Sequence, residues 1–501
     1  MSASPSIWSR LRALFRGSKT PPVEVTPTVP TPAGTPTATP AIASVPAPPK
    51  EPRSAQPPPA VFAASEQPPA PPPRPSVTIV AAPVVDLVLG VDLGTCCTKV
   101  VIGDPGWKDC SFAVPLTTSR NGISTWLHPT RLGAETNLKM RLMDKPLDDD
   151  IQDIVACYLA EVMNLSCSWF AANCPTDYRR RENRWKLNLG FPGKKVDSGS
   201  LAAAYHEVAG TAVALSSQPE PPSPQLAASI RRKTTTFAPF IAPSHVQLYP
   251  EIAAQLAGYV NSPYRHRGNL VLIDVGAGTL DTSTIILHGD QEYDIVSFHV
   301  CEVAPLGALR LYQERSSALK RIQADCIQHE LECYQGGDKP IPELFQDIVH
   351  PQYRNSPELK ETFQAVSKEF EHNVIDSPWS CLARFRTIQR NAHDNPAYDP
   401  WGDELLCFIT GGGSRSRFYR RLLADGPLEE KLIPFSRWHP EPWQRHSWKQ
   451  GLRLEKMPMP DPEKLREFPT SLSKDFDRLS VAYGLAFGGE NLMKVTAATH
   501  Q

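Results

Sequence analysis

Three glycine-rich turns, each following an apolar run, carry residue types that bind nucleotide phosphates. The first turn begins Asp-Leu-Gly-Thr at Asp92 and continues to Lys99. Gly94 would let backbone amides approach a phosphate closely. The hydroxyls of Thr95 and Thr98 would add donors and Lys99 positive charge, while Asp92 can hold a cation through water. The same letters also fit an ordinary hairpin, so this turn alone is weak evidence.

The second turn repeats this design about 180 residues later and reads Asp-Val-Gly-Ala-Gly-Thr-Leu-Asp from Asp274 to Asp281. Gly276, Gly278 and Thr279 can cradle phosphates as the first turn does. The echo predicts two related halves whose hairpins face each other and clamp a triphosphate. Asp274 and Asp281 would place carboxylates beside it for magnesium and water. Because both glycine-rich turns begin with an aspartate, two hairpins with a purely structural role are a poor explanation.

The third turn follows the apolar run 405–409. Gly411, Gly412 and Gly413 would let backbone and ligand meet, followed by Ser414 and Arg415, whose guanidinium plane can stack on a purine. The spacing fits neither the Gly-x-Gly-x-x-Gly dinucleotide fingerprint nor a Walker-type phosphate loop. Taken alone, a strand-to-helix turn without a ligand explains this segment equally well.

The elements that must position these turns lie after a proline-rich stretch. The chain has 501 residues and 52 prolines, and no packed domain tolerates the proline density of residues 21–83, because proline lacks the backbone donor. We expect this stretch to be a disordered, extended spacer. With Lys+Arg at 52 and Asp+Glu at 53, the balance gives no reason to expect nucleic-acid binding.

Cysteine usage and hydropathy indicate a soluble, cytoplasmic protein. The 11 cysteines are scattered without a Cys-x-x-Cys pair, which favours a reducing compartment over a disulfide framework. We find no apolar run long enough to cross a membrane and no secretory signal. Cys96 and Cys97 lie inside the first turn, where small residues filling a tight turn are the simplest interpretation.

Residues 1–20 resemble a short basic amphipathic helix. Ile7, Leu11, Leu14 and Phe15 fall on one face, and Arg and Lys side chains surround it. Residues 5–19 of such a helix could lie on a membrane or dock into a partner, and a tail without structure fits the sequence about as well. If the helix anchors, the spacer acts as a tether.

In this order and spacing, the three turns resemble the actin-like ATPase superfamily, which includes actin, DnaK-type heat-shock chaperones and sugar kinases. The DnaK-type ATPase domain is the nearest relative. Segment 92–99 is similar to the family's first phosphate loop, 274–281 to its second and 409–414 to its adenosine loop. Segments 248–254 and 477–486 resemble the two connecting helices that hinge the lobes.

The resemblance implies a two-lobe, actin-like (ribonuclease H-like) α/β fold. We expect the first lobe at 84–260, the second at 261–489 and a C-terminal tail at 490–501. It implies ATP and Mg²⁺ as ligands, with Asp92, Asp274 and Asp281 at the metal. Asp274, Glu251 and Asp92 would be catalytic, with Asp274 or Glu251 orienting the hydrolytic water.

The sequence departs from the chaperone pattern at several places. The acidic residue of the first connecting helix precedes its proline in chaperones, whereas Glu251 follows Pro250 here. The lysine that follows a Gly-x-x-Ala segment in the first lobe has no counterpart until Lys139. Ser416 replaces the stacking arginine. Only residues 490–501 follow the second connecting helix region, so we expect no peptide-binding domain and no peptide-holding activity.

These features leave several functions open. The first is a slowly hydrolysing ATPase that acts as a nucleotide-dependent conformational switch for an unidentified protein partner. The second is an actin-like scaffold or filament tethered by its N-terminal helix. A small-molecule kinase is the third, although we find no substrate motif beyond the phosphate loops. A member that binds ATP without hydrolysing it is the fourth, so whether the chain is an enzyme stays open.

Overall fold

The computed structural model describes residues 84–106, 110–118, 124–125, 128–129, 137–179, 181–192, 199–234, 245–260, 262, 264–289, 294–330, 341–391, 404–424, 426, 431–434, 451–458, 465–466, 476–486 and 494–497. The chain divides into two units, Met1–Thr78 and Ile79–Gln501, and every described residue belongs to the second unit. The N-terminal helix and proline-rich spacer predicted for residues 1–83 lie outside the described residues.

The first sheet is built around β1 (Val84–Leu93). Strands β2 (Cys97–Gly103) and β3 (Ser111–Ala113) continue it on one side, each antiparallel to its neighbour, while β7 (Glu182–Phe191) and β8 (Val246–Pro250) continue it in parallel on the other. Side chains on both faces of β1 are buried along nearly its whole length. This burial explains its unbroken apolar sequence, since a strand covered on both faces needs no polar alternation.

The second sheet is built in the same way around β9 (Gly268–Val275). Strands β10 (Leu280–Gly289) and β11 (Asp294–Ala304) follow as antiparallel neighbours, and β12 (Glu404–Thr410) and β14 (Gly451–Glu455) lie in parallel on the other side. The central five strands of the two sheets therefore share one order and one set of directions. This repetition confirms the predicted two-lobe, actin-like α/β fold.

Short strands near the end of the chain extend both sheets. β15 (Leu465–Arg466) pairs with β3 of the first sheet, although the predicted boundary assigns it to the second lobe. β16 (Lys494–Ala497) falls in the predicted C-terminal tail and pairs with β11 of the second sheet. The open edges of β3 and β11 offer unpaired backbone groups, which these two segments satisfy. The remaining short strands are β4 (Thr117–Thr118), β5 (Ser124–Thr125), β6 (His128–Pro129) and β13 (Lys431–Pro434).

Three helices pack together in the first lobe: α3 (Asp149–Asn173), α5 (Ser200–Ser216) and α6 (Pro224–Thr234). The Asp148 carboxylate caps α3 by accepting from the Ile151 amide at 3.2 Å. By length and composition α3 could cross a membrane, and 56% of its most apolar window is buried inside the protein. Its side chains share one core with the first sheet, as in the core helix of a globular domain. The shorter helices of this lobe are α2 (Leu138–Asp144) and α4 (Thr176–Arg179).

In the second lobe, α10 (Pro357–Asn391) packs on β10 and β11 and against α8 (Ala308–Ile322). A separate apolar cluster joins α8 to the segment around α9 (Phe345–Ile348). The other helical pieces are two 3₁₀ turns at Pro351–Tyr353 and Gly412–Arg415, helix α11 (Arg417–Tyr419) and a π-helical turn at Arg420–Ala424.

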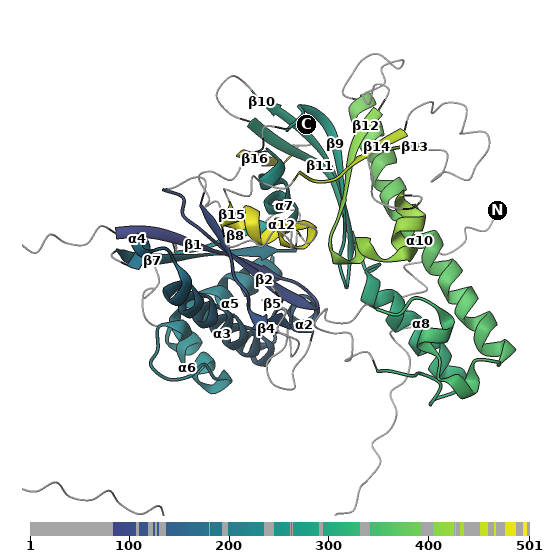
Figure 1. Ribbon diagram of the computed structural model, residues 1–501, viewed down its shortest axis with the longest axis horizontal. Coiled ribbons are helices and arrows are strands. Elements are labelled where there is room, and N and C mark those ends of the chain that lie inside the picture. Colours follow the sequence, from purple (N-terminus) through teal and green to yellow (C-terminus); the bar gives the residue numbers. More distant parts are fainter. Residues whose placement is uncertain are drawn as a thin grey trace, which may run out of the picture. The chain divides into compact units, whose positions relative to one another are not determined.

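Two helices, α7 (Glu251–Val260) and α12 (Phe476–Leu485), cross each other beside the first sheet (Figure 1). Glycine makes the close approach: an added Cβ on Gly484 would overlap the carbonyl of Ala254. α12 also lies directly on the first sheet, where Gly90 faces the Ala482 carbonyl. The two segments predicted as connecting helices are therefore packed against each other.

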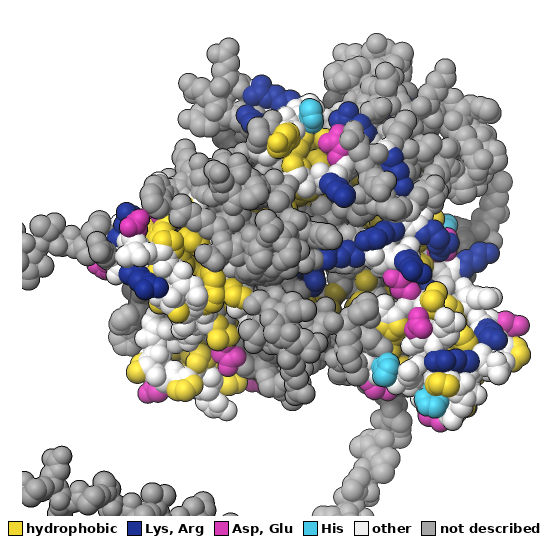
Figure 2. Space-filling view, viewed as in Figure 1, with side chains coloured by type: hydrophobic (Ala, Val, Ile, Leu, Met, Phe, Trp, Pro, Cys, Tyr) yellow, Lys and Arg dark blue, Asp and Glu magenta, His cyan; other side chains and the backbone are white. Residues whose placement is uncertain are grey.

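The described surface carries charges of both signs. Figure 2 shows Lys and Arg side chains interspersed with Asp and Glu over the face in view. This mixture matches the nearly balanced charge of the sequence.

Candidate nucleotide site

One cavity of about 470 Å³ gathers the three glycine-rich turns. Its volume falls within the usual range of ligand sites. Thirteen of the sequence-predicted site residues line it: Asp92, Gly94, Thr95, Lys99, Glu251, Asp274, Gly276, Thr279, Asp281, Gly411, Gly412, Gly413 and Arg415. They come from both sheets and from α7, so residues as far apart in the sequence as Asp92 and Arg415 meet in one cavity.

The first turn joins β1 to β2 as a tight hairpin. The Gly94 amide donates to the Cys97 carbonyl at 3.1 Å, and Asp92 is paired with Lys99 across the two strands. The Lys99 ammonium lies 2.8 Å from the Asp92 carboxylate. Lys99, which is expected to bind phosphate, and Asp92, which is expected to hold metal-bound water, thus neutralise each other's charge. Cys96 and Cys97 also line the cavity.

The second turn joins β9 to β10, with the Gly276 amide donating to the Thr279 carbonyl at 2.8 Å. It faces the first turn closely, because a Cβ added to Gly278 would lie 3.0 Å from the Thr95 hydroxyl. The start of α8 supports it from behind, where the Leu309 amide donates to the Ala277 carbonyl at 2.8 Å. The two hairpins therefore oppose each other as the sequence echo predicts.

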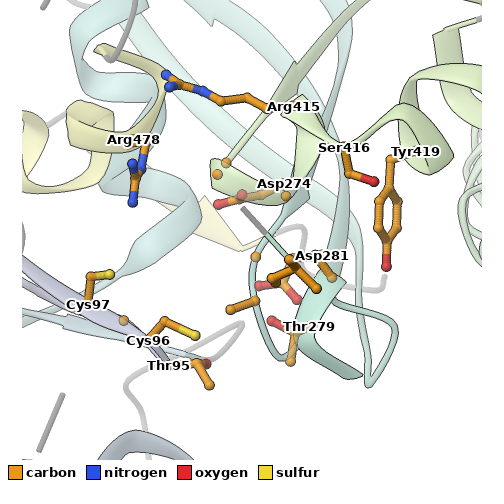
Figure 3. A pocket seen from close by; sticks show the side chains of 18 of the residues that line it. Thr95, Cys96, Cys97, Asp274, Thr279, Asp281, Arg415, Ser416, Tyr419 and Arg478 are labelled. Atoms are coloured by element: carbon orange, nitrogen blue, oxygen red, sulfur yellow. The ribbon is translucent and has the colours of Figure 1, made fainter. Parts of the chain in front are cut away.

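The third turn requires glycine for its backbone. Gly411 has φ 81°, a conformation that side-chain-bearing residues rarely adopt, and a Cβ there would overlap the Asp274 carboxylate. A Cβ on Gly413 would lie 2.7 Å from the Val275 side chain. Glycines thus let the third turn pack directly on the second. Tyr419 and Ser416 follow in the cavity wall (Figure 3).

A buried ion pair closes the cavity between the lobes. The Lys139 ammonium donates to both carboxylate oxygens of Glu251, at 2.6 and 2.7 Å. Burial lowers the pKa of Lys139, but the charges around it, led by Glu251, outweigh burial and raise the pKa. Burial likewise raises the pKa of Glu251, against the opposing effect of Lys139. Lys139 is outside the predicted site set, although it is the first lysine after segment 133–136.

Three further residues of the connecting helices, Gln255, Arg478 and Val481, reach the cavity without having been predicted. Gln255 lies one turn after Glu251 on the same face of α7, and its amide donates to Thr410 at 2.8 Å and to the Asp274 carboxylate at 3.1 Å. Arg478 lies in α12 one turn before Val481, which also lines the cavity. Helical periodicity from Glu251 could have found Gln255, whereas α12 carries no predicted site residue from which Arg478 could have been found.

Three predicted residues do not line the cavity. Thr98 is fully buried and accepts a hydrogen bond from the Tyr158 hydroxyl at 2.8 Å. Gly278 faces the Thr95 side chain. The Ser414 hydroxyl donates to the Gly411 carbonyl at 2.7 Å and so closes the third turn from inside. Their contacts shape the loops that carry the lining residues.

Asp274 and Asp281 suit a magnesium ion that keeps its water shell. The Oδ1 atom of each is buried and has no hydrogen-bond partner among the described residues. Among those residues, no three His, Cys, Asp or Glu side chains come together to hold a metal directly. Mg²⁺ prefers oxygen ligands and usually retains several waters. Asp274, Asp281 and Asp92 therefore fit ligands to metal-bound water better than a closed protein cage.

These carboxylates are held in an environment that disfavours their charge. Burial, followed by the negative charge of Asp92, raises the pKa of Asp274 to about 6. Burial, followed by the charges of Asp274 and Glu251, raises the pKa of Asp281 to about 8, while Lys139 and a hydrogen bond from Thr279 oppose the rise. Both shifts favour the protonated, uncharged form of these two side chains.

We expect Asp281→Asn to stabilise the ligand-free protein increasingly as pH rises. Folded Asp281 keeps its proton up to about pH 8, whereas the unfolded side chain loses it near pH 4. The wild-type protein therefore loses stability across this interval and the Asn variant does not. Between pH 6 and pH 8 the advantage of Asn should grow by about 2 kcal/mol. Urea unfolding without Mg²⁺ measures this difference.

Asp144→Asn is the matched control for this experiment, since Asp144 is exposed at the end of α2. A pH-independent difference between Asp281→Asn and the wild-type protein would contradict the assignment of a buried, charge-disfavouring site.

Comparison with known proteins finds similarity to solved structures only at low sequence identity. No protein-family model matches the sequence, and no curated protein sequence matches it. Ethanolamine utilization protein EutJ from Carboxydothermus hydrogenoformans is a similar solved structure, covering 80% of this chain and 90% of that chain at 12% identity and a TM-score of 0.34. An identity and a TM-score this low assign no ligand or role to this chain.

Proposed function

We propose that this chain binds ATP with Mg²⁺ in the 470 Å³ cavity, hydrolyses it slowly and acts as a nucleotide-dependent conformational switch. The observation that carries the proposal is the convergence of three glycine-rich turns and five carboxylates on one cavity. Opposed hairpins supply backbone donors for phosphates, and the third turn supplies an open backbone for the nucleoside. A fold alone does not assign a function, so the proposal rests on the chemistry of the site residues.

The reacting end of the cavity lies where Glu251, Lys139 and Asp281 meet. Glu251 or Asp274 would orient the attacking water, while Lys139 and Lys99 would neutralise charge on the phosphates. Mg²⁺ bound to the phosphates would add further neutralisation of the charge that develops during transfer. Asp92 and Asp274 would hold its waters. These are positioning and electrostatic tasks that involve no covalent intermediate.

The cavity beyond Glu251 and Asp281 favours water over a larger acceptor. A second cavity shares these two residues with the first and is otherwise lined largely by apolar side chains, among them Phe191, Phe298 and Cys301. Its volume of about 20 Å³ is enough for about one water molecule. This size supports hydrolysis more than transfer to a sugar-sized substrate.

The switch follows from the helices that reach the site. Glu251 and Gln255 tie α7 to the cavity, and Arg478 and Val481 tie α12 to it. The two helices cross at Gly484 with no space between their backbones. A change in the contacts that either helix makes with the nucleotide would therefore shift the position of the other helix. A protein partner or the N-terminal segment would bind differently to the two arrangements of these helices.

Titration of the purified protein with ATP and Mg²⁺, followed by phosphate release over hours, tests the proposal. We expect saturable binding and slow release. Asp274→Ala and Lys99→Ala should each weaken ATP·Mg binding by about 10-fold or more, because each removes a charged contact. Deletion of residues 1–83 should leave binding unchanged.

Unchanged affinity in both point variants would remove the site assignment. Binding without phosphate release would support a member that holds ATP without hydrolysing it. ATP-dependent sedimentation of the wild-type protein would favour the scaffold or filament function over the switch.

A further inference from the structure

Arg478 differs from the two lysines that share the cavity with it. Lys99 is 2.8 Å from Asp92, and Lys139 is 2.6 Å from Glu251. Across the described part of the chain, the Arg478 guanidinium has neither a hydrogen-bond nor an ion-pair partner, although five carboxylates line the same cavity. Figure 3 shows its side chain extending from α12 into the cavity. Among the described carboxylates, none pairs with this cation.

The guanidinium lies between the first and the third turn. A Cβ added to Gly412 would be 3.5 Å from the Arg478 Nε atom. Burial lowers the pKa of Lys99 and Asp92 raises it, for a net rise, and the positive charge of Arg478 is among the effects that oppose the rise. Arg478 is therefore close enough to act on Lys99 electrostatically. The positive charges of Lys99 and Arg478 act on each other within the cavity, which favours an anion bound near both.

The backbone that carries Arg478 is firmly held. α12 packs on α7 at Gly484 and on β1 at Gly90, where no side chain separates the backbones. Ser480, two residues after Arg478, lies 3.3 Å from the Gln255 amide. A fixed helix thus presents a planar, permanently charged fork, the geometry that matches phosphate oxygens.

We propose that Arg478 binds the phosphate chain of the nucleotide and so links the phosphates directly to α12. The inference rests on the proposed function, because it assigns a ligand group within the same site. Figure 3 shows Arg478 on the side of the cavity away from Asp281 and Thr279. Its contact is therefore with the phosphates near the nucleoside, which ADP and ATP share.

Binding of ATP, ADP and adenosine to Arg478→Gln, each with Mg²⁺, tests the inference. We expect ADP and ATP to bind about 10- to 100-fold more weakly than to the wild-type protein, since a charge-assisted contact is lost, and adenosine to bind as before. Arg478→Lys keeps the positive charge but lacks the planar guanidinium fork. Its affinity for ADP and ATP should lie between those of the wild-type protein and Arg478→Gln. Thermal stability of the variant without nucleotide should be unchanged or higher, because no hydrogen bond or ion pair to a described residue is lost.

Arg417→Gln is the matched control, since Arg417 is exposed on α11 and does not line the cavity. It should bind all three ligands as the wild-type protein does. Wild-type affinity of Arg478→Gln for ADP would overturn the inference, as would an equal loss for adenosine or a loss of ligand-free stability. If the wild-type protein binds none of the three ligands, the proposed function itself falls.

Discussion

Gly484→Ala should lower the free energy of unfolding by about 3 kcal/mol, because a methyl group would be forced into the crossing of α7 and α12. The added Cβ would overlap the carbonyl oxygen of Ala254, a backbone atom that cannot rotate away. The helices would have to separate, and α12 would lose its packing against the first sheet. Urea unfolding of both proteins at one pH measures the difference.

Gly210→Ala gives this prediction a matched control. Gly210 lies inside α5, and a Cβ there would meet no atom within 4 Å. Alanine is favoured over glycine in a helix interior, so this variant should gain about 0.5–1 kcal/mol. The same substitution is thus expected to have opposite signs at two helical sites. Equal changes at both would show that the helix crossing is not tightly packed.

Lys139→Met should destabilise the protein by about 3 kcal/mol and abolish any ATP hydrolysis. The substitution leaves the buried Glu251 carboxylate without the ammonium that now donates to both of its oxygens. Burial already raises the pKa of Glu251, and loss of the positive charge raises it further. The deficit should therefore grow as pH rises, because the lone carboxylate must ionise. Unfolding at pH 5 and pH 8 measures this growth.

The double variant Lys139→Met/Glu251→Gln separates stability from catalysis. It removes both charges and should recover most of the lost stability while hydrolysis stays absent. Lys320→Met is the control, since Lys320 lies 2.6 Å from Glu330 but the two side chains are 37% and 64% exposed. An exposed pair contributes about 0–1 kcal/mol. A loss at Lys320 as large as at Lys139 would contradict the special role of burial.

The hairpins could be predicted because their signals are local. An apolar run, an acidic residue, a tight glycine turn and a second apolar run lie within twenty residues at both Asp92 and Asp274. Repetition of this pattern also predicts two related halves, which the matching strand orders confirm. Edge strands such as β15 and β16 carry no such signal, because segments of two and four residues take their pairing from a neighbouring strand.

The chemistry of the site was harder to predict where it depends on distant residues. Lys139 and Glu251 are 112 residues apart, and only the folded chain brings them together. Thr98 illustrates a different limit. Neighbouring strand residues point to opposite faces, so a cavity-facing Lys99 requires Thr98 to face the core. Strand alternation could therefore have excluded Thr98, whereas nothing in the sequence assigns Arg478 to the cavity.

The seating of α12 on β1 has a consequence for synthesis of the chain. β1 ends at Leu93, whereas the helix that covers it begins at Phe476. While the ribosome makes the intervening residues, the apolar surface that will meet α12 stays uncovered. Contacts of such long sequence separation also form slowly after release. We therefore expect the nascent first lobe to need cellular factors that shield apolar surface until α12 emerges.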